Sequence, residues 1–223
     1  MASTEALHAR NLFSLKGHVC LVSGGGTGIG LMTSQALAAN GAKVYITGRR
    51  IEVLQKAAKE HSPRSSQPNL NGEIIPIGPC DVTEKDELES LVSELEAKEK
   101  YLSLFVAAAG VAGPKGFADS GDAREVKKEL WGESVEEWNA TYSSDVTSVY
   151  FSTVAVLPLL QAAPTRQKAS VIVISSMSGM MRHSQAHFSY NAAKAATVHL
   201  SRMMSKEFGK VGVRVNSRLS LSV

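Results

Sequence analysis

Short apolar runs alternate along the chain with segments whose apolar positions recur at helical spacing. Six runs have the length and composition of buried strands: His18–Val22, Val44–Thr47, Glu73–Ile77, Leu102–Ala107, Ser170–Ile174 and Val213–Asn216. Between strands, Glu84–Lys100 places its leucines and Val92 on one stripe among charges, as a helix packing on a sheet does. This alternation predicts an α/β fold: a doubly wound parallel sheet with helices on both faces.

Length and composition favour one domain. A chain of 223 residues with 43% hydrophobic residues can bury one substantial core, and neither an internal repeat nor a linker divides it. We therefore expect a single dinucleotide-binding and catalytic domain over residues 1–223. The insertion Gly113–Gly132 mixes charges, so it is either a surface excursion or a segment that overhangs the site.

A glycine-rich turn follows the first predicted strand. Gly24-Gly25-Gly26-Thr27-Gly28-Ile29-Gly30 leads into a helical pattern, which Asn40-Gly41 ends before the second strand. Glycines let the backbone turn tightly and approach a pyrophosphate, while the helix N-terminus offers unpaired N–H groups to the anion. The turn predicts a dinucleotide site, although a tight βα turn without a ligand has the same pattern.

Tyr190 and Lys194 stand four residues apart, downstream of the Ser175-Ser176 pair that ends the fifth predicted strand. Side chains at i and i+4 lie on one face of a helix and can enter the same pocket. An ammonium close to a phenol favours its anion, which brings the phenol toward the range useful for catalysis. The pair therefore predicts acid–base chemistry by Tyr190, although such a pair also arises by chance.

The order of these motifs resembles the classical branch of the short-chain dehydrogenase/reductase family over nearly the whole chain. Five ordered matches carry the resemblance: Ser23-Gly24-x-x-x-Gly28-x-Gly30, Asp81 in Cys80-Asp81-Val82, Ala109-Gly110, Ser176 placed 14 residues before Tyr190, and Val213-Arg214-Val215-Asn216. The resemblance implies a Rossmann-like fold that binds a nicotinamide dinucleotide. It also implies assembly into a homodimer or homotetramer.

The resemblance also implies roles for individual residues. Tyr190 would be the proton donor or acceptor, Lys194 would lower the pKa of Tyr190 and hold the nicotinamide ribose, and Ser176 would hydrogen-bond the substrate oxygen. Asp81 falls where the family's aspartate contacts adenine. The expected cofactor contacts are Ser23, Gly24, Thr27, Gly28, Ile29, Gly30, Asp81, Ala109, Gly110, Tyr190 and Lys194.

Three departures from the family pattern bear on activity. The family's catalytic asparagine falls on Asp145, where a carboxylate would keep Lys194 charged but offset its field at Tyr190. Ala107-Ala108 stands where two asparagines are usual, which removes polar groups from the cofactor wall. Ser217–Val223 stands in place of the family's Pro-Gly turn, substrate-covering segment and last strand. We therefore expect the last strand to be missing and an edge strand to be exposed.

The end of the second predicted strand bears on cofactor preference. An NAD site places an acidic residue near Thr47 for the adenine-ribose hydroxyls, whereas this chain reads Thr47-Gly48-Arg49-Arg50. A guanidinium can grip phosphate oxygens and stack on adenine, so the sequence favours NADP(H), with Arg49 as the ligand of the 2′-phosphate. In the alternative interpretation, Arg49 and Arg50 simply begin a solvated helix.

Composition narrows the class further. The formal net charge is +3 and the basic residues are dispersed, so nucleic acid is not an expected partner. Residues 1–16 lack an apolar signal core, and no apolar run reaches the ~18 residues of a membrane span. Cys20 and Cys80 resemble buried thiols, and the histidines lack metal-ligand spacing. We therefore expect a cytoplasmic protein without a metal or a membrane partner that acts on a small-molecule substrate.

Two hypotheses of function remain open. In the first, the chain is an NADP(H)-dependent oxidoreductase of ketoreductase type that interconverts a carbonyl and a secondary alcohol. Tyr190 then transfers the proton, with Ser176, Lys194 and Asp145 as the other catalytic residues. In the second, it is a truncated or degenerate NADP(H)-binding protein without catalysis. The Ser176/Tyr190/Lys194 set favours the first, whereas Asp145 and the short C-terminal segment favour the second.

Overall fold

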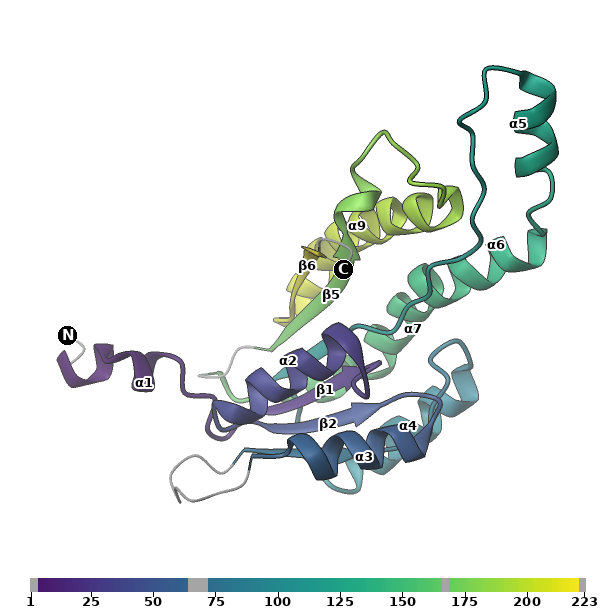
Figure 1. Ribbon diagram of the computed structural model, residues 1–223. Helices are drawn as coiled ribbons and strands as arrows, with labels where there is room; N and C mark the ends of the chain where they lie inside the picture. The colour runs from purple at the N-terminus through teal and green to yellow at the C-terminus, as the bar shows by residue number, and fades with distance from the viewer. Residues whose placement is uncertain (1–3, 64–71, 166–168, 221–223) are drawn as a thin grey trace.

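The computed structural model describes residues 4–63, 72–165 and 169–220. In this part of the chain six strands form one sheet: β1 (Val19–Ser23), β2 (Lys43–Thr47), β3 (Glu73–Pro76), β4 (Leu104–Ala107), β5 (Ser170–Ser176) and β6 (Arg214–Ser220). Their order is β3-β2-β1-β4-β5-β6, and every neighbouring pair is parallel (Figure 1). The predicted α/β class and parallel sheet are confirmed.

The strands differ from their predicted ranges mainly at the ends. β4 begins at Leu104 rather than at Leu102. β6 continues to Ser220 rather than ending at Asn216, because it pairs with β5 in an unbroken register from Ser170↔Arg214 to Ser176↔Ser220. Within the described residues β6 is an edge of the sheet. Of the C-terminal segment, residues 221–223 lie outside the described residues.

Helices cover both faces of the sheet, as the alternation of side chains in each strand requires. The first face contacts α2 (Gly28–Ala39) and α3 (Ile51–His61), and the second contacts α4 (Lys85–Glu96), α7 (Ser148–Ala155), α8 (Leu157–Gln161) and α9 (Phe188–Phe208). In β1, for example, Val22 packs in the cluster with Leu54 of α3, whereas Leu21 packs in the cluster with Leu91 of α4. The described chain thus forms one doubly wound α/β unit.

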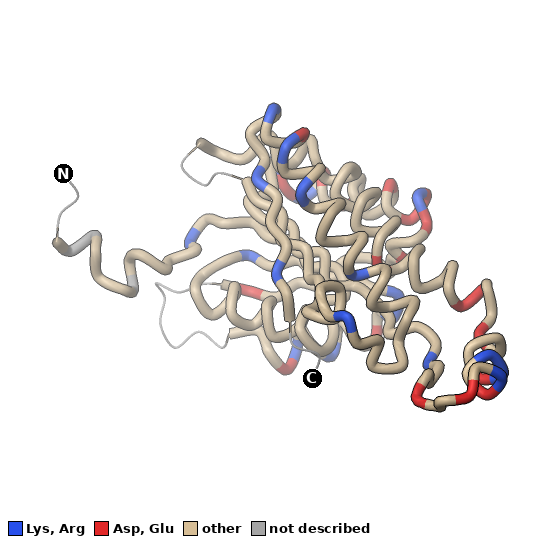
Figure 2. The backbone as a smooth tube through the Cα atoms, turned by 90° about the horizontal axis from the view of Figure 1, so that it is seen from above, with Lys and Arg blue, Asp and Glu red and all other residues tan. Residues whose placement is uncertain are grey.

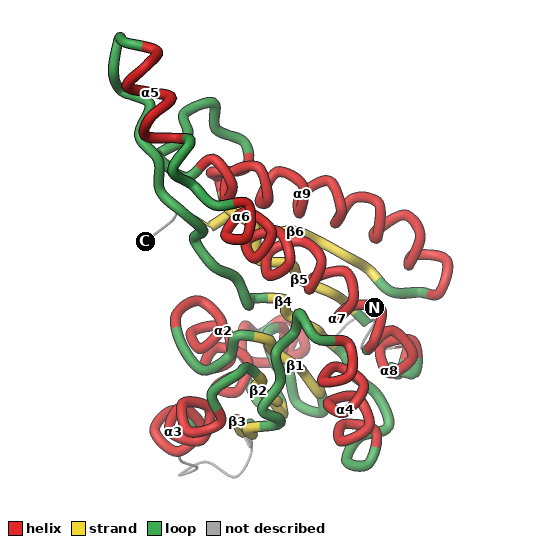
Figure 3. Tube along the Cα trace, turned by 90° about the vertical axis from the view of Figure 1, so that its right-hand side faces the viewer, coloured by secondary structure: helices red, strands yellow, loops and turns green. Residues whose placement is uncertain are grey.

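Coverage of the first face is uneven. α2 and α3 lie over the half of the sheet that contains β1, β2 and β3 (Figure 3). Over β4, β5 and β6, no helix in the described part of the chain occupies that face, and Leu104, Ile172 and Ile174 are only half buried there. This part of the sheet face is therefore open, and the pocket that borders it is lined in part by Leu104 and Ile172.

Two segments extend from the body. The predicted insertion carries α5 (Ala123–Leu130), which stands beyond α6 (Val135–Tyr142) as an arm with charges of both signs (Figures 1 and 2). At the other end, η1 (Thr4–Leu7) and α1 (Ala9–Leu12) lead into β1. The arm's base is anchored, because the backbone N–H of Gly116 donates to the carbonyl of Ala186 at 2.9 Å. Ala186 lies just before α9, so the insertion starts beside the candidate site.

Candidate active site

At Gly24 and Gly30, the glycine turn between β1 and α2 is packed too tightly to accept a side chain. Gly24 adopts a left-handed conformation (φ +66°), and a Cβ there would lie 2.9 Å from the Cα of Ala109. A Cβ on Gly30 would lie 2.3 Å from the carbonyl oxygen of Gly24. Bare backbone therefore lines the turn, as close approach to a pyrophosphate requires.

The N-terminus of α2 leaves hydrogen-bond donors available at this turn. Thr27 precedes the helix in an extended conformation, and its side chain makes no capping hydrogen bond. The N–H groups of Gly28, Ile29 and Gly30 have no acceptor inside the helix, because the first turn has no preceding carbonyls. Unpaired donors and the positive end of the helix dipole together favour an anion. The residues present thus fit a phosphate-bearing cofactor.

Ser23 connects this turn to the loop after β4. Its buried Oγ accepts hydrogen bonds from the backbone N–H of Ala108 at 3.2 Å and of Ala109 at 3.5 Å. Gly110 follows, and a Cβ there would lie 2.5 Å from Oδ1 of Asp145. The structure therefore brings the predicted Ser23, Ala109 and Gly110 together between the glycine turn and the predicted catalytic side chains.

A substitution at Gly30 tests this packing. Gly30→Ala would place a methyl group against backbone, and we expect the free energy of unfolding to fall by about 1–3 kcal/mol, as overpacking does. Denaturant unfolding measures the change. The matched control is Gly209→Ala, where a Cβ meets nothing within 4 Å. A Gly30→Ala protein as stable as Gly209→Ala would contradict the packing described here.

The predicted adenine side of the site is arranged around the ends of β2 and β3. Arg49 is exposed just after β2, and its side chain makes no ion pair within the described residues. Asp81 folds back on Thr83, because its Oδ1 accepts from the N–H of Thr83 at 3.0 Å and from the hydroxyl at 2.8 Å. Thr47 Oγ1 is buried without a hydrogen-bond partner. Thr47 is not among the residues that the sequence predicts for the site, and the sequence gives no sign that its hydroxyl lacks a partner.

Ser176, Tyr190 and Lys194 converge at the carboxyl end of β5. Ser176 is fully buried, and its Oγ accepts a hydrogen bond from the N–H of Ser178 at 3.1 Å, in η4 (Met177–Gly179). That bond leaves the hydroxyl proton of Ser176 free to donate to another acceptor. On α9, Lys194 Nζ lies 5.4 Å from the centroid of the Tyr190 ring. The i, i+4 spacing thus brings the two side chains to one place, as predicted for one helical face.

Asp145 lies against this group from η2 (Ser143–Thr147), a π-helical segment between α6 and α7. Its side chain is fully buried, and Oδ1 lies 3.6 Å from Lys194 Nζ and accepts from the N–H of Val111 at 3.0 Å. Oδ2 has no hydrogen-bond partner. π-helical turns inside α-helices often mark functional sites. Burying a carboxylate oxygen without a hydrogen-bond partner costs free energy.

The pKa of Tyr190 is raised, so the expected lowering by Lys194 is wrong for this structure. Burial of the phenol is the main cause; the hydrogen bond with Ser176 opposes it, and the charge of Asp145 adds to it. The pKa of Lys194 is itself lowered, because burial outweighs the attraction of Asp145. Burial likewise raises the pKa of Asp145 against the opposing effects of Lys194 and the Val111 N–H.

Several neighbours of the site were not predicted. The hydroxyl of Thr197 donates to the backbone carbonyl of Asp145 at 2.8 Å, which holds η2 against α9. Gly179 packs η4 against the same helix, since a Cβ there would lie 2.6 Å from the backbone of Lys194. Thr197 lies one turn after Lys194, which is the signal that could have identified it. In β4, Ala107 is buried in the core.

Other site types have little support in the structure. Among the described residues, no group of three His, Cys, Asp or Glu side chains could hold a metal ion. Cys20 and Cys80 are both free thiols and buried. In the described part of the chain, no helix has the length and apolar character needed to cross a membrane.

Comparisons with known proteins agree with this geometry. The short chain dehydrogenase family profile matches residues 18–219. The short-chain dehydrogenase/reductase PhomF of Diaporthe leptostromiformis is 39% identical over 96% of this chain and 72% of its own length. The NADP-dependent mannitol dehydrogenase of Alternaria alternata is 32% identical over 96% of this chain and 73% of its own.

A solved structure gives the same result. The complex of Pseudomonas aeruginosa RhlG with NADP has a TM-score of 0.78 and 30% identity, over 92% of this chain and 72% of that one. The family profile matches most of the chain, and several relatives exceed 30% identity over most of both sequences. The chain therefore belongs to the short-chain dehydrogenase/reductase family of oxidoreductases.

Proposed function

We propose that the protein is an NADP(H)-dependent oxidoreductase that interconverts a carbonyl and a secondary alcohol. The observation that carries the proposal is the convergence of Ser176, Tyr190 and Lys194 at the carboxyl end of β5. The glycine turn and the α2 N-terminus lie at the same edge of the parallel sheet, where ligands of such folds bind. An acid–base group therefore shares one edge with a phosphate cradle.

The proposed cofactor site combines two kinds of hydrogen-bond donor, backbone N–H groups and an arginine side chain. Backbone N–H groups at Gly28, Ile29 and Gly30 would hold the diphosphate, and Arg49 would hold the 2′-phosphate that distinguishes NADP from NAD. Support also comes from relatives: RhlG was solved with NADP, and the Alternaria relative is named NADP-dependent. When bound, NADP(H) supplies or accepts a hydride at the nicotinamide.

Side chains of this protein would carry out the proton transfer that accompanies hydride transfer. In reduction, the Tyr190 hydroxyl gives its proton to the substrate oxygen as that oxygen gains negative charge. Ser176 holds the same oxygen with its hydroxyl proton, because its Oγ already accepts from Ser178. Lys194 places an ammonium beside the phenolate that remains, but burial of the phenol and the charge of Asp145 outweigh its effect. In oxidation the same groups act in reverse, and Tyr190 accepts the proton of the alcohol.

A second function, cofactor binding with little turnover, is favoured by one observation. The ammonium of Lys194 faces the Asp145 carboxylate at 3.6 Å and donates to the carbonyl of Ile174 at 3.3 Å. Both contacts engage the ammonium, while burial of the phenol and the charge of Asp145 raise the pKa of Tyr190. The alternative is therefore a member of the family that binds NADP(H) without catalysis, and substitution of Asp145 separates the two functions.

We extend the proposal to the protein's location, domain organisation and assembly. It would act on a small-molecule substrate in the cytoplasm as one domain, residues 1–223, assembled into a homodimer or homotetramer. Tyr150 and Val154, one turn apart on α7, stay exposed and support subunit pairing through this helix. Light scattering after size-exclusion chromatography checks the assembly.

Arg49→Asp tests the cofactor preference. We expect NADPH affinity to fall by more than about tenfold, because a charge-assisted contact becomes a repulsion, while NADH affinity changes little. Fluorescence titration of purified protein with each cofactor measures both constants. Arg50→Asp is the matched control, since Arg50 is the exposed neighbour that directly precedes α3. Unchanged NADPH affinity in Arg49→Asp would contradict the assignment.

A further inference from the structure

A second exposed arginine, Arg218, lies at the edge of the sheet on the face that carries α2. Arg218 lies on the edge strand β6, among the residues that line an open pocket with Leu104 and Ile172. These two residues belong to the sheet face that carries α2, so Arg218 lies on that face. Within the described residues, its guanidinium makes no ion pair and no side-chain hydrogen bond.

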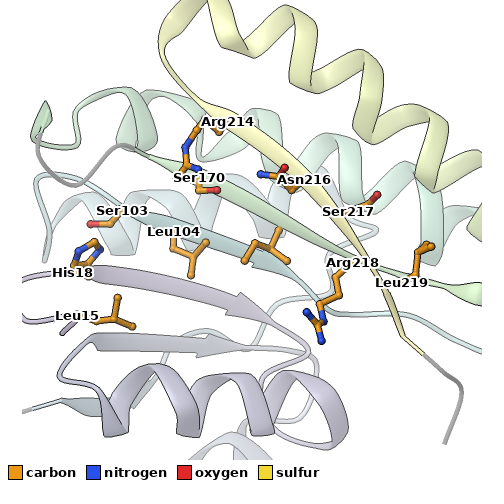
Figure 4. A pocket seen from close by; sticks show the side chains of 11 residues that line it. Leu15, His18, Ser103, Leu104, Ser170, Arg214, Asn216, Ser217, Arg218 and Leu219 are labelled. Carbon is orange, nitrogen blue, oxygen red and sulfur yellow. The ribbon is translucent and has the colours of Figure 1, made fainter. Parts of the chain in front are cut away.

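The strand register places Arg218 level with the glycine turn. Arg218 pairs with Ile174 of β5, one residue after the Val173↔Ala107 pair, and Ala107 in turn pairs with Ser23 of β1. One further step along β1 is Gly24, the first glycine of the turn. Figure 4 shows the side chain of Arg218 extending from β6 across the sheet toward the end of β1.

The separation suits a bridging anion. β6 and β1 are three strand spacings apart, or roughly 14 Å. An extended arginine side chain covers part of that span, and a phosphate with hydrogen bonds of about 2.9 Å on each side covers much of the remainder. A guanidinium is the side chain best matched to phosphate oxygens, because it presents parallel N–H donors. Its partner on the other side would be the α2 N-terminus.

The strand order also decides which phosphate Arg218 could reach. Arg49 follows β2, which lies on one side of β1, whereas β6 lies on the opposite side, beyond β4 and β5. The 2′-phosphate assigned to Arg49 is thus separated from Arg218 by the width of the central strands. The diphosphate, centred on the glycine turn between them, is the phosphate that both NADP and NAD possess.

We infer that Arg218 is a further ligand of the dinucleotide diphosphate. It would contact the diphosphate from the edge strand β6, on the opposite side of β1 from Arg49. The inference rests on the proposed function, because it requires that the glycine turn holds the diphosphate. It adds a cationic contact that does not distinguish NADP(H) from NAD(H). Arg49 then sets the preference for NADP(H), and Arg218 adds affinity common to both cofactors.

The test compares NADPH and NADH titrations of the unmodified protein and of Arg218→Ala. We expect affinity for both cofactors to fall by a similar factor, about tenfold or more, because one charge-assisted hydrogen bond to a shared phosphate is lost. Arg218→Lys keeps the charge but loses the paired N–H donors of the guanidinium. Its affinity for both cofactors should lie between those of the unmodified protein and of Arg218→Ala. Arg214→Ala, on the same strand at the opposite end, is the matched control and should keep its affinity.

Two results would overturn the inference. Unchanged affinity of Arg218→Ala for both cofactors would make Arg218 a solvated surface charge, and a loss confined to NADPH would place it at the 2′-phosphate instead. Thermal melting without cofactor checks that each variant is folded. Failure of the proposed function looks different, because the unmodified protein would then bind neither cofactor.

Discussion

Tyr190→Phe is expected to reduce kcat for carbonyl reduction by at least about a hundredfold, the usual contribution of a positioned general acid. The substitution removes the proton and leaves the ring, so the contact with Lys194 and the packing of α9 are kept. Cofactor affinity should remain within about threefold of the unmodified protein, because the ring and its helix are unchanged. Steady-state kinetics and fluorescence titration measure the two quantities separately.

Tyr150→Phe is the matched control for this loss. Tyr150 is exposed on α7, with its ring against Phe151, and we place it outside the catalytic group. Its variant should turn over at the unmodified rate. If Tyr190→Phe were as active as Tyr150→Phe, Tyr190 would not be the proton donor, and the catalytic half of the proposal would fail.

Asp145→Asn is expected to move the pH–rate profile to lower pH. The carboxylate raises the pKa of Tyr190, so its neutral replacement lowers that pKa, and an amide oxygen can still accept from the N–H of Val111. Alcohol oxidation requires the phenolate, so its rising limb should shift toward acid. Carbonyl reduction requires the phenol, so its falling limb should shift in the same direction. Rates measured across pH in both directions check the sign.

The profile reports a coupled group rather than one residue. Tyr190, Lys194 and Asp145 lie close enough to influence one another's titration. The apparent pKa values in the profile therefore belong to the group as a whole. Asp86→Asn, in the exposed first turn of α4, removes the same charge without touching this group and should leave the profile in place. A profile of Asp145→Asn that coincides with that of Asp86→Asn would remove Asp145 from the proton chemistry.

The features predicted well from the sequence are local ones. The glycine turn between a strand and a helix depends on neighbours in the chain, and so does the meeting of Tyr190 and Lys194 on one helical face. The strand pattern predicted the parallel sheet because buried strands carry continuous apolar runs. These signals need no knowledge of distant packing.

The features that were missed depend on contacts between distant segments. Asp145 is held by Val111, 34 residues away, and its backbone by Thr197, 52 residues away. The raised pKa of Tyr190 follows from burial, which several elements create together and which a charge-pair argument from spacing ignores. β6 is longer than predicted because β5 continues beside it, although Arg218 interrupts its apolar pattern.

Hydride transfer from labelled cofactor tests the central claim most directly. The protein would be incubated with NADPH deuterated at the transferable position and with ketones that include a sugar, a steroid, a polyketide and a 3-oxoacyl thioester. Mass spectrometry then follows the alcohols. We expect at least one secondary alcohol with a single deuterium on its carbinol carbon, formed far more slowly by Tyr190→Phe. Folded protein that binds NADPH yet forms no labelled alcohol would contradict it.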